Sequence, residues 1–297
     1  MFFTLLVISL LFLFLITYTF YSNVQDRKAI QERIETMNNF VFSLEKDLPR
    51  QLYTSGFRVL FLLERRITET GEYITDLEDV FSEVFYNATI YGETNDEIQQ
   101  MMNGVTYSGI LESTNQKADK INLKVNLTDP LLVISQDNPW SVKLNLTADL
   151  LIEDKSNLAL WNLTSYSIVT YISIENFEDP LYIVETSGYV SNKFNKTIYN
   201  VPVSIDDLPS HSQNSYYINS TLAPSFLDRL QGIKTANENG IESLVYLPEL
   251  SAQGVSVKDK SCVDYIYFSS QNPPSQNIGG MPDWFKIDDE HLGLYGI

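Results

Sequence analysis

Six asparagines, each opening an Asn-x-Thr tripeptide, are the residues whose type and spacing point most directly to a chemistry. This tripeptide accepts N-linked glycans, which are bulky and lie on the surface of domains outside the cytoplasm. All six use Thr at the third position, and three are the same tripeptide, Asn-Leu-Thr. Their joint pattern predicts a glycoprotein with attachment at Asn87, Asn126, Asn145, Asn162, Asn195 and Asn219. The alternative is that Asn and Thr are simply polar residues of a strand face.

Two histidines and an acidic cluster near the C-terminus are the other candidates for chemistry. Asp288, Asp289 and Glu290 precede His291, and such ligands could bind a hard cation. The same run fits the acidic first turn of a short helix, so we assign no metal site. His211 lies in a polar stretch, and we find no nucleophile elbow, phosphate-binding loop, dinucleotide-binding or zinc-protease motif. We therefore assign no catalytic residue and no cofactor, and we do not expect an enzyme.

The charge balance limits the classes of partner. The chain of 297 residues has a formal net charge of −18, and a polyanion is repelled by phosphate backbones. We therefore expect no nucleic-acid partner. The single cysteine, Cys262, excludes an intrachain disulfide, and we expect it to be a small, buried, apolar residue.

The N-terminal segment is the element that must place these residues on one side of a membrane. Phe2 to Tyr21 carries no charge, and about 20 helical residues cross the ~30 Å hydrocarbon core of a bilayer. The segment ends in aromatic side chains instead of the small residues of a cleavage site. We predict a retained signal-anchor over residues 1–22 that contacts membrane lipid through residues 2–21. A buried helix of a soluble protein is the alternative.

The two signals for orientation disagree. Arg27, Lys28 and Arg33 follow the span, and the positive-inside rule alone would leave the large domain in the cytoplasm. The glycosylation tripeptides favour the opposite side. We resolve the conflict by expecting that Met1 is not the natural start and that basic residues lie upstream. The predicted topology is single-pass in the cytoplasmic membrane, with the C-terminal domain at the cell surface.

A heptad spacing follows the anchor. Apolar residues recur at intervals of four and three residues, as in an amphipathic helix, at Ile30, Ile34, Met37, Val41, Leu44 and Leu48. This predicts one helix from Phe2 to about Leu48, which Pro49 kinks or breaks, within a helical stem over residues 23–74. The seam packs either on the chain's own domain or against other copies of the chain in self-assembly, and both alternatives remain open.

Short helices are predicted over residues 75–120. In TDLEDVFSEVF and TNDEIQQMMNGV, Thr75 with Glu78 and Thr94 with Glu97 have the spacing of a capping box. Apolar residues then lie on one face of each helix: Leu77, Val80, Phe81 and Val84 in the first, and Ile98, Met101 and Met102 in the second. A further short helix is expected over residues 110–119.

The hydrophobic period changes from that of a helix to that of a strand at residue 121. Residues 121–128, 141–150 and 160–174 alternate apolar and polar side chains, which is typical of half-buried strands. Breaks are expected at Asp129-Pro130, QDNPW and EDKSN, and the short connections favour antiparallel order. In each Asn-Leu-Thr, Asn and Thr then point to solvent while Leu points to the core.

The remaining segments complete one domain over residues 75–297, with a β-rich part over 121–297. DPLYIVETSGYVSNKF is predicted to be a bent strand pair that turns at Ser187-Gly188. PSFLDRLQG is expected to be a helix, SCVDYIYFSS a strand and IDDEHLGLYG a short terminal helix. The fold class is therefore predicted to be α+β. A transmembrane helix continues into an amphipathic helical stem, and an antiparallel β-meander domain with short helices follows.

This layout resembles that of type IV pilins and pseudopilins. The helix over Phe2 to Leu48 and the meander over Ile121 to Ile174 carry the resemblance, although Thr4 is the polar residue where many pilins have a glutamate. DPLYIVETSGYVSNKF and GIESLVYLPELSAQGVSVKDKSCVDYIYFS are similar to segments of uncharacterised membrane-anchored surface proteins of archaea. The resemblance implies a protein that assembles or adheres at the cell envelope.

Three functional hypotheses follow. The first is a membrane-anchored structural or adhesion protein, either pilin-like or another envelope component, which contacts other copies or other envelope proteins. The second is a ligand-binding or sensor ectodomain. The third is an anchored hydrolase, for which the sequence contains no catalytic motif.

Overall fold

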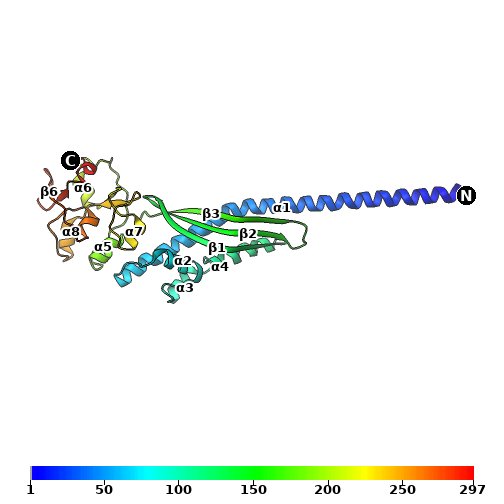
Figure 1. The fold of residues 1–297 in the computed structure, drawn as a ribbon, viewed down its shortest axis with the longest axis horizontal. Helices are drawn as coiled ribbons and strands as arrows, with labels where there is room; N and C mark the ends of the chain where they lie inside the picture. Colours follow the sequence, from blue (N-terminus) through cyan, green and yellow to red (C-terminus); the bar gives the residue numbers. More distant parts are fainter. Residues whose placement is uncertain (1) are drawn as a thin grey trace. The chain divides into compact units, whose positions relative to one another are not determined.

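The computed structural model of the protein describes residues 2–297 and has the predicted α+β class (Figure 1). A long N-terminal helix is followed by short helices, a three-stranded antiparallel sheet and a C-terminal part of short elements. The chain divides into two compact units. Unit 1 contains the chain up to Gln51, Tyr107–Leu131 and Leu146–Ile168, and unit 2 contains Leu52–Thr106, Leu132–Asn145 and Val169–Ile297.

The elements have the following bounds. The α-helices are α1 (Phe2–Thr70), α2 (Leu77–Asn87), α3 (Asp96–Met102), α4 (Tyr107–Asp119), α5 (Pro180–Glu185), α6 (Leu208–Gln213), α7 (Phe226–Leu230), α8 (Leu247–Ala252) and α9 (Asp264–Tyr267), with a 3₁₀ helix η1 (Leu292–Tyr295). The strands are β1 (Leu123–Asn138), β2 (Ser141–Asp154), β3 (Leu160–Ser173), β4 (Tyr217–Asn219), β5 (Ile241–Ser243), β6 (Ser275–Asn277) and β7 (Lys286–Asp288).

Helix α1 extends beyond the end that the sequence predicted. Pro49 lies inside the helix and does not end it. A proline in a helix interior removes one backbone hydrogen bond and costs about 3 kcal/mol. Leu48 and Leu52 are both buried, and burial of one leucine contributes about 1.5–3 kcal/mol. A break at Pro49 does not occur because burial on this face offsets the lost hydrogen bond.

The predicted stem seam divides into an exposed pair and a buried set. Ile30 and Ile34 are 38% and 46% exposed. The other four residues of the seam are buried, namely Met37, Val41, Leu44 and Leu48. These four side chains pack against other residues of the same chain, which is one of the two alternatives that the sequence left open. Ile30 and Ile34 are the seam residues that another copy of the chain could contact.

Polar contacts join α1 to other elements of unit 1. Arg33 Nε donates to Asp154 Oδ1 at 3.1 Å, and Arg33 Nη2 donates to Ile121 O at 3.2 Å. The ammonium of Lys117 in α4 pairs with the Asp47 carboxylate of α1. Arg33, one of the basic residues after the apolar segment, therefore contributes to packing inside the unit.

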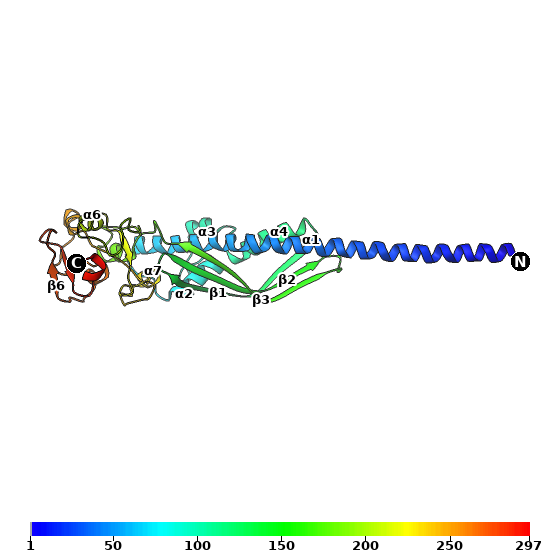
Figure 2. The same cartoon turned by 90° about the horizontal axis from the view of Figure 1, so that it is seen from above.

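The three-stranded sheet has the order β1-β2-β3, so β2 is central and β1 and β3 are edge strands (Figure 1). Figure 2 shows the same strands from above. Pro139 and Trp140 join β1 to β2, and residues 155–159 join β2 to β3. Connections this short require antiparallel neighbours. Even-numbered residues of β2 are buried from Val142 to Asp154, which confirms the predicted strand period there.

The two edge strands each contain a residue that shifts the alternation. In β1, odd-numbered residues are buried up to Leu127, whereas Leu132 is buried beyond Asp129. Asp129, where the alternation shifts in β1, has a φ of 50°. The alternation of β3 shifts at Ser165, which has a φ of 53°. One extra residue of this kind is a β-bulge. The predicted break at Asp129-Pro130 is therefore a bulge inside one strand, where Pro130 is tolerated because β1 is an edge strand.

Gly56 allows close packing of α1 on the sheet within unit 2. A Cβ at this position would lie 2.1 Å from Leu144 Cδ1 and 2.8 Å from Ile172 Cδ1. We expect Gly56→Ala to lower the free energy of unfolding by about 1–2 kcal/mol, because overpacking outweighs the roughly 1 kcal/mol by which Ala favours a helix. Urea denaturation measures the change. The double variant Gly56→Ala with Leu144→Ala should lose less stability than the sum of the losses in the two single variants. A Gly56→Ala chain that is more stable than the native one would contradict the prediction.

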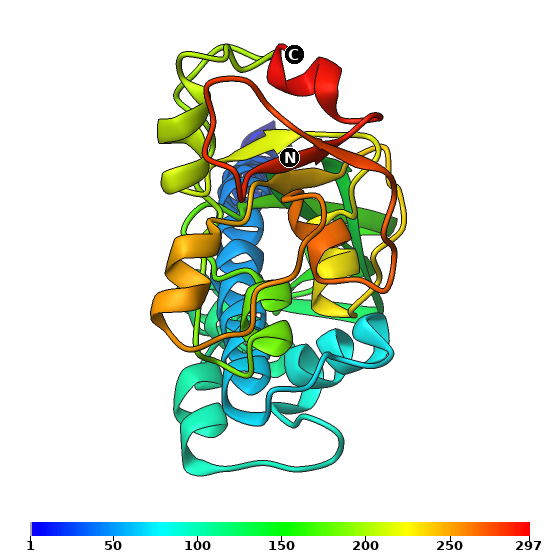
Figure 3. The same ribbon diagram turned by 90° about the vertical axis from the view of Figure 1, so that its left-hand side faces the viewer.

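The C-terminal part of unit 2 combines short helices with two-stranded pairs (Figure 3). β4 pairs antiparallel with β5, and β6 pairs antiparallel with β7. Short elements expose many polar backbone ends, so their stability depends on the side chains packed between them. The shared core includes Leu181, Leu244, Cys262 and Phe285, all fully buried.

Two strand predictions in this part were wrong. Pro180–Glu185 is helix α5. Asp179 caps its N-terminus, because the Asp179 side chain accepts a hydrogen bond from Leu181 N at 2.9 Å. The turn at Ser187-Gly188 is confirmed by the positive φ of both residues. Asp264–Tyr267 is helix α9, and all its residues are buried, so periodicity cannot distinguish helix from strand there. Only the later part of the predicted terminal helix is helical, as the 3₁₀ helix η1, because Ile287 and Asp288 belong to β7.

The helices after the stem have the predicted positions but different caps. Asp76, with a φ of 52°, precedes α2 and makes no side-chain capping bond. Asn95 caps α3, and its side chain accepts a hydrogen bond from Ile98 N at 2.8 Å. The Thr75 hydroxyl instead bonds to the hydroxyl of Tyr91, and the Thr94 hydroxyl donates to the carbonyl of Ala88. The predicted capping boxes are therefore wrong, although the predicted apolar faces of both helices are largely buried.

Candidate functional site

The N-terminal part of α1 is the first candidate site. Every residue from 2 to 32 is exposed, and the segment is long and apolar enough to cross a membrane. The hydroxyl groups of Ser9, Thr17 and Thr19 bond back to carbonyls of the same helix. Ser9 Oγ donates to Leu6 O at 2.9 Å, and Thr19 Oγ1 donates to Leu15 O at 3.0 Å. A helix whose polar groups are satisfied internally meets the requirement that hydrocarbon imposes.

None of the six predicted glycan acceptors is buried. Four are exposed (Asn87, Asn162, Asn195 and Asn219), and two are half-buried (Asn126 and Asn145). Leu127 and Leu146, at the centre of their Asn-Leu-Thr tripeptides, are buried as predicted, whereas Leu163 is half-buried. The acceptors lie where a glycan could be attached, and their occupancy stays a prediction.

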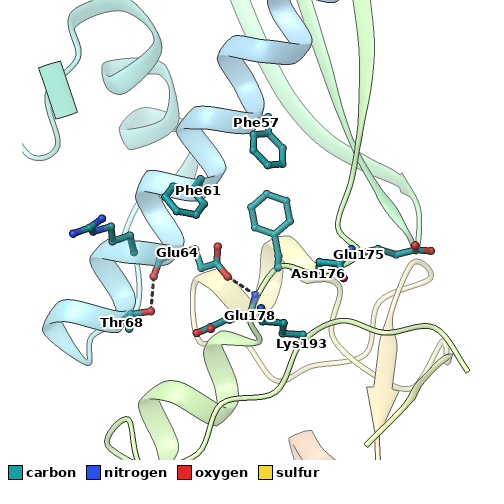
Figure 4. Close-up of a pocket in the computed structure, with 10 residues that line it drawn as sticks. Phe57, Phe61, Glu64, Thr68, Glu175, Asn176, Glu178 and Lys193 are labelled. Atoms are coloured by element: carbon teal, nitrogen blue, oxygen red, sulfur yellow. Dashed lines mark hydrogen bonds between the residues drawn. The ribbon is translucent and has the colours of Figure 1, made fainter. Parts of the chain in front are cut away.

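The second candidate site is a pocket of 340 Å³ in unit 2, between one face of α1 and the segment that follows β3 (Figure 4). Phe57 and Phe61 of α1 line it and are 41% and 38% exposed. Phe177 also lines the pocket and is buried, with its ring centroid 5.4 Å from that of Phe57. Aromatic rings and several charged side chains line this pocket together, and its volume lies within the range of small-ligand sites.

Glu64 places a carboxyl group in this pocket although it is only 8% exposed. Its Oε1 accepts a hydrogen bond from the backbone N–H of Glu178. Removal from water disfavours the charged form, so burial raises the pKa of Glu64 to about 7. The neighbouring Glu178 carboxylate raises the pKa further, and the Lys193 ammonium acts in the opposite direction.

The charged residues around Glu64 give the pocket an acidic excess. Glu175 and Glu178 line it, together with Lys193, which is exposed. Arg65 also lines it, but its guanidinium is engaged by Glu69 and Glu97. When Glu64 is ionised, the carboxylates of the pocket therefore outnumber the cations available to a ligand.

The buried carboxyl should make stability depend on pH. Because the pKa of Glu64 is raised on folding, its contribution to stability is complete below about pH 4.5 and is lost as pH rises through about 7. Glu64→Gln should therefore stabilise the chain at about pH 8 by roughly 1–3 kcal/mol, with little effect at about pH 5. Urea denaturation at the two pH values measures this. Glu175→Gln, at an exposed position of the pocket, is the control, and equal effects of Glu64→Gln at both pH values would contradict the prediction.

A fully buried charge cluster joins four elements of unit 2, namely α7, α9, β4 and β5, to the residue that caps α5. Arg229 of α7 bonds to Asp179 Oδ2 at 2.5 Å and to Asp264 Oδ2 at 2.9 Å. Tyr217 donates to Asp179 at 2.8 Å, and Ser243 donates to Asp264 at 2.9 Å. All five side chains are buried, so no substrate reaches them. The cluster is a structural link between short elements.

His291 belongs to a second buried cluster. Its Nδ1 lies 2.6 Å from Asp288 Oδ1, and its Nε2 lies 2.9 Å from the Tyr265 hydroxyl and 3.4 Å from Glu242 Oε2. Burial opposes the charged form, but the hydrogen bond to the Asp288 carboxylate and the nearby charge of the Glu242 carboxylate outweigh it and raise the pKa of His291 to about 10. The imidazolium is therefore a buried counter-ion. Asp289 and Glu290 are exposed, so the acidic run does not converge on one cation.

The remaining candidates from the sequence are also buried. His211 is fully buried, and its Nδ1 lies 3.1 Å from Thr197 Oγ1. Burial lowers the pKa of His211 to about 4, so it is neutral at pH 7. Cys262 is free and fully buried, as predicted, and burial raises the pKa of its thiol to about 11.

Sequence reasoning missed the pocket and both charge clusters. One local signal could have indicated Glu64. It lies on the same helical face as the buried Leu60, Leu63 and Ile67, where a carboxylate is unusual. For Arg229 no local signal exists, because its partners are 35 and 50 residues away in the chain.

No protein family, curated protein or solved structure that was compared with the chain matches it. The functional assignment therefore depends on the sequence and the geometry of the chain itself.

Proposed function

We propose that the protein is a membrane-anchored component of the cell surface, held by the exposed apolar part of α1 with its α+β domain outside the cytoplasm. The exposure of residues 2–32 carries this proposal, since a soluble chain rarely leaves so large an apolar surface uncovered. Tyr18, Phe20 and Tyr21 suit the aromatic belt at a membrane interface. The six Asn-x-Thr tripeptides, none of whose asparagines is buried, favour an exterior location.

The role that this arrangement supports best is structural: a pilin-like or adhesive component of an archaeal type of envelope. A long N-terminal helix that is apolar first and amphipathic later suits assembly, because neighbouring anchors can pack along their exposed faces. Ile30 and Ile34 are the parts of the seam that remain available for such contacts. Two exposed apolar residues one turn apart make a small contact, so the anchor itself would supply most of the interface.

Cysteine cross-linking in membranes tests this assembly. Ile30→Cys and Ile34→Cys place a thiol on the exposed part of the seam, and Glu32→Cys places one on the opposite side of the same exposed turn as a matched control. The native Cys262 is buried and gives little background. We expect disulfide-linked dimers from the two seam positions and few from Glu32→Cys. Equal cross-linking at all three positions, or none, would refute assembly through the seam.

A second role, ligand binding by the ectodomain, is favoured by the pocket that contains Glu64. A raised carboxyl pKa in an aromatic pocket is a frequent feature of binding sites. The two roles are compatible, because the pocket lies in unit 2 whereas the exposed apolar segment belongs to unit 1.

A further inference from the structure

The pocket of unit 2 combines an aromatic wall with a carboxyl group that has spare hydrogen-bonding capacity. Phe57, Phe61 and Phe177 supply the wall. Among the residues that the structure describes, only the Glu178 amide donates to the Glu64 carboxyl, and it does so at Oε1. A carboxylate can accept several hydrogen bonds through its two oxygens. Oε2 of Glu64 can therefore accept a donor that a ligand brings into the pocket.

The charge and size of the pocket restrict that ligand. Glu64, Glu175 and Glu178 line it, whereas Lys193 is the one lining cation that no described carboxylate pairs. Aromatic faces attract cations, and a carboxylate forms its strongest hydrogen bonds with charged donors. The volume of 340 Å³ lies at the small end of the range for ligand pockets. A small cation with an apolar body meets all three conditions.

We propose that this pocket binds a small ammonium compound whose apolar body lies against Phe57, Phe61 and Phe177 and whose cation pairs with Glu64. This inference rests on the ligand-binding role proposed above and names its ligand class. Binding the cation stabilises the carboxylate form of Glu64, so the side chain releases its proton to solvent as the ligand enters. The proton passes from the Glu64 carboxyl to water, and no covalent bond forms between the ligand and the protein.

The inference is tested by isothermal titration calorimetry of the full chain in detergent micelles, with titrations into micelles alone subtracted. Benzylamine is the probe, benzyl alcohol its neutral counterpart and benzoate its anionic counterpart. We expect saturable binding of benzylamine that is about tenfold tighter than that of benzyl alcohol, as a charge-assisted hydrogen bond requires, and no saturable binding of benzoate.

Two variants locate the binding. Glu64→Gln keeps the shape and one acceptor oxygen but removes the charge, and it should weaken benzylamine about tenfold while leaving benzyl alcohol unchanged. Phe61→Ala should weaken both ligands. Phe42→Ala is the matched control, because Phe42 is a 62% exposed phenylalanine of the same helix in unit 1, whereas the pocket belongs to unit 2. It should change neither affinity.

The affinity should also depend on pH. The charged groups that line the pocket with Glu64 are Glu175, Glu178, Lys193 and Arg65. With a pKa of about 7, Glu64 is mostly protonated at about pH 6 and mostly ionised at about pH 8. Benzylamine resembles a lysine side chain and stays protonated in this range, so its binding should tighten several-fold between the two values.

The outcomes separate the ligand class from the binding role. If benzyl alcohol or benzoate binds as tightly as benzylamine, or if Glu64→Gln leaves benzylamine unaffected, the assignment to ammonium compounds is overturned while the binding role stands. If none of the three probes binds saturably, the inference and the binding role are both overturned.

Discussion

Arg229→Met should destabilise the protein more than any other single substitution considered. The change removes the guanidinium between Asp179 and Asp264 and leaves two carboxylates buried without a counter-ion. Breaking a buried ion pair from one side costs about 3–5 kcal/mol. Urea denaturation followed by tryptophan fluorescence should show a fall of this size in the free energy of unfolding.

Two further variants define the cause of that loss. Arg50→Met is the matched control, because Arg50 pairs with Asp47 while its side chain is 76% exposed. An exposed pair contributes at most about 1 kcal/mol. Adding Asp264→Asn to Arg229→Met should recover part of the stability, since it removes one of the stranded charges. An Arg229→Met chain as stable as the native one would show that the cluster does not hold the short elements together.

His291→Gln should have the second largest effect, and the loss should depend on pH. The native imidazolium neutralises the buried carboxylates of Asp288 and Glu242, so its removal at about pH 6 should cost roughly 3 kcal/mol or more. Because the pKa of His291 is raised on folding to about 10, its contribution is complete below about pH 6.5 and is lost as pH rises towards 10.

The pH window identifies His291 as the source. Between about pH 7.5 and 9.5 the native chain should lose roughly 1 kcal/mol of stability per pH unit, whereas His291→Gln should lose less. Glu290→Gln, which changes an exposed carboxylate of the same turn, should keep the native slope. The same slope in His291→Gln would mean that other groups titrate in this range.

Asp288 affects stability at low pH. Burial would raise the pKa of its carboxyl, but the hydrogen bond from His291 lowers it below the usual value. The contribution of Asp288 to stability is therefore lost only under strongly acidic conditions.

Patterns of short range predicted the larger elements correctly. The regular alternation of β2 and the apolar faces of α2 and α3 are properties of neighbouring residues, and each is present in the structure. The errors arose where a distant contact decides the local outcome. Pro49 stays helical because its neighbours Leu48 and Leu52 are buried, and Asp129 becomes a bulge because β1 continues to pair beyond it.

The polar sites lay beyond prediction for a related reason. Glu64 receives its hydrogen bond from a residue 114 positions later in the chain, and neither residue carries a motif. His291 has a local partner in Asp288, but Glu242 and Tyr265 reach it from other elements. Composition could suggest that such groups exist, whereas their burial follows only from the fold.

In the proposed topology, the apolar part of α1 holds the chain in a membrane while the domain faces the exterior. Labelling of a Tyr189→Cys chain in intact cells with a membrane-impermeant maleimide tests it most directly, because Tyr189 is 67% exposed and the native Cys262 is buried. We predict labelling before lysis, on a chain that stays in the membrane pellet after an alkaline wash. A chain that is labelled only after lysis, or that the wash releases, would contradict the account.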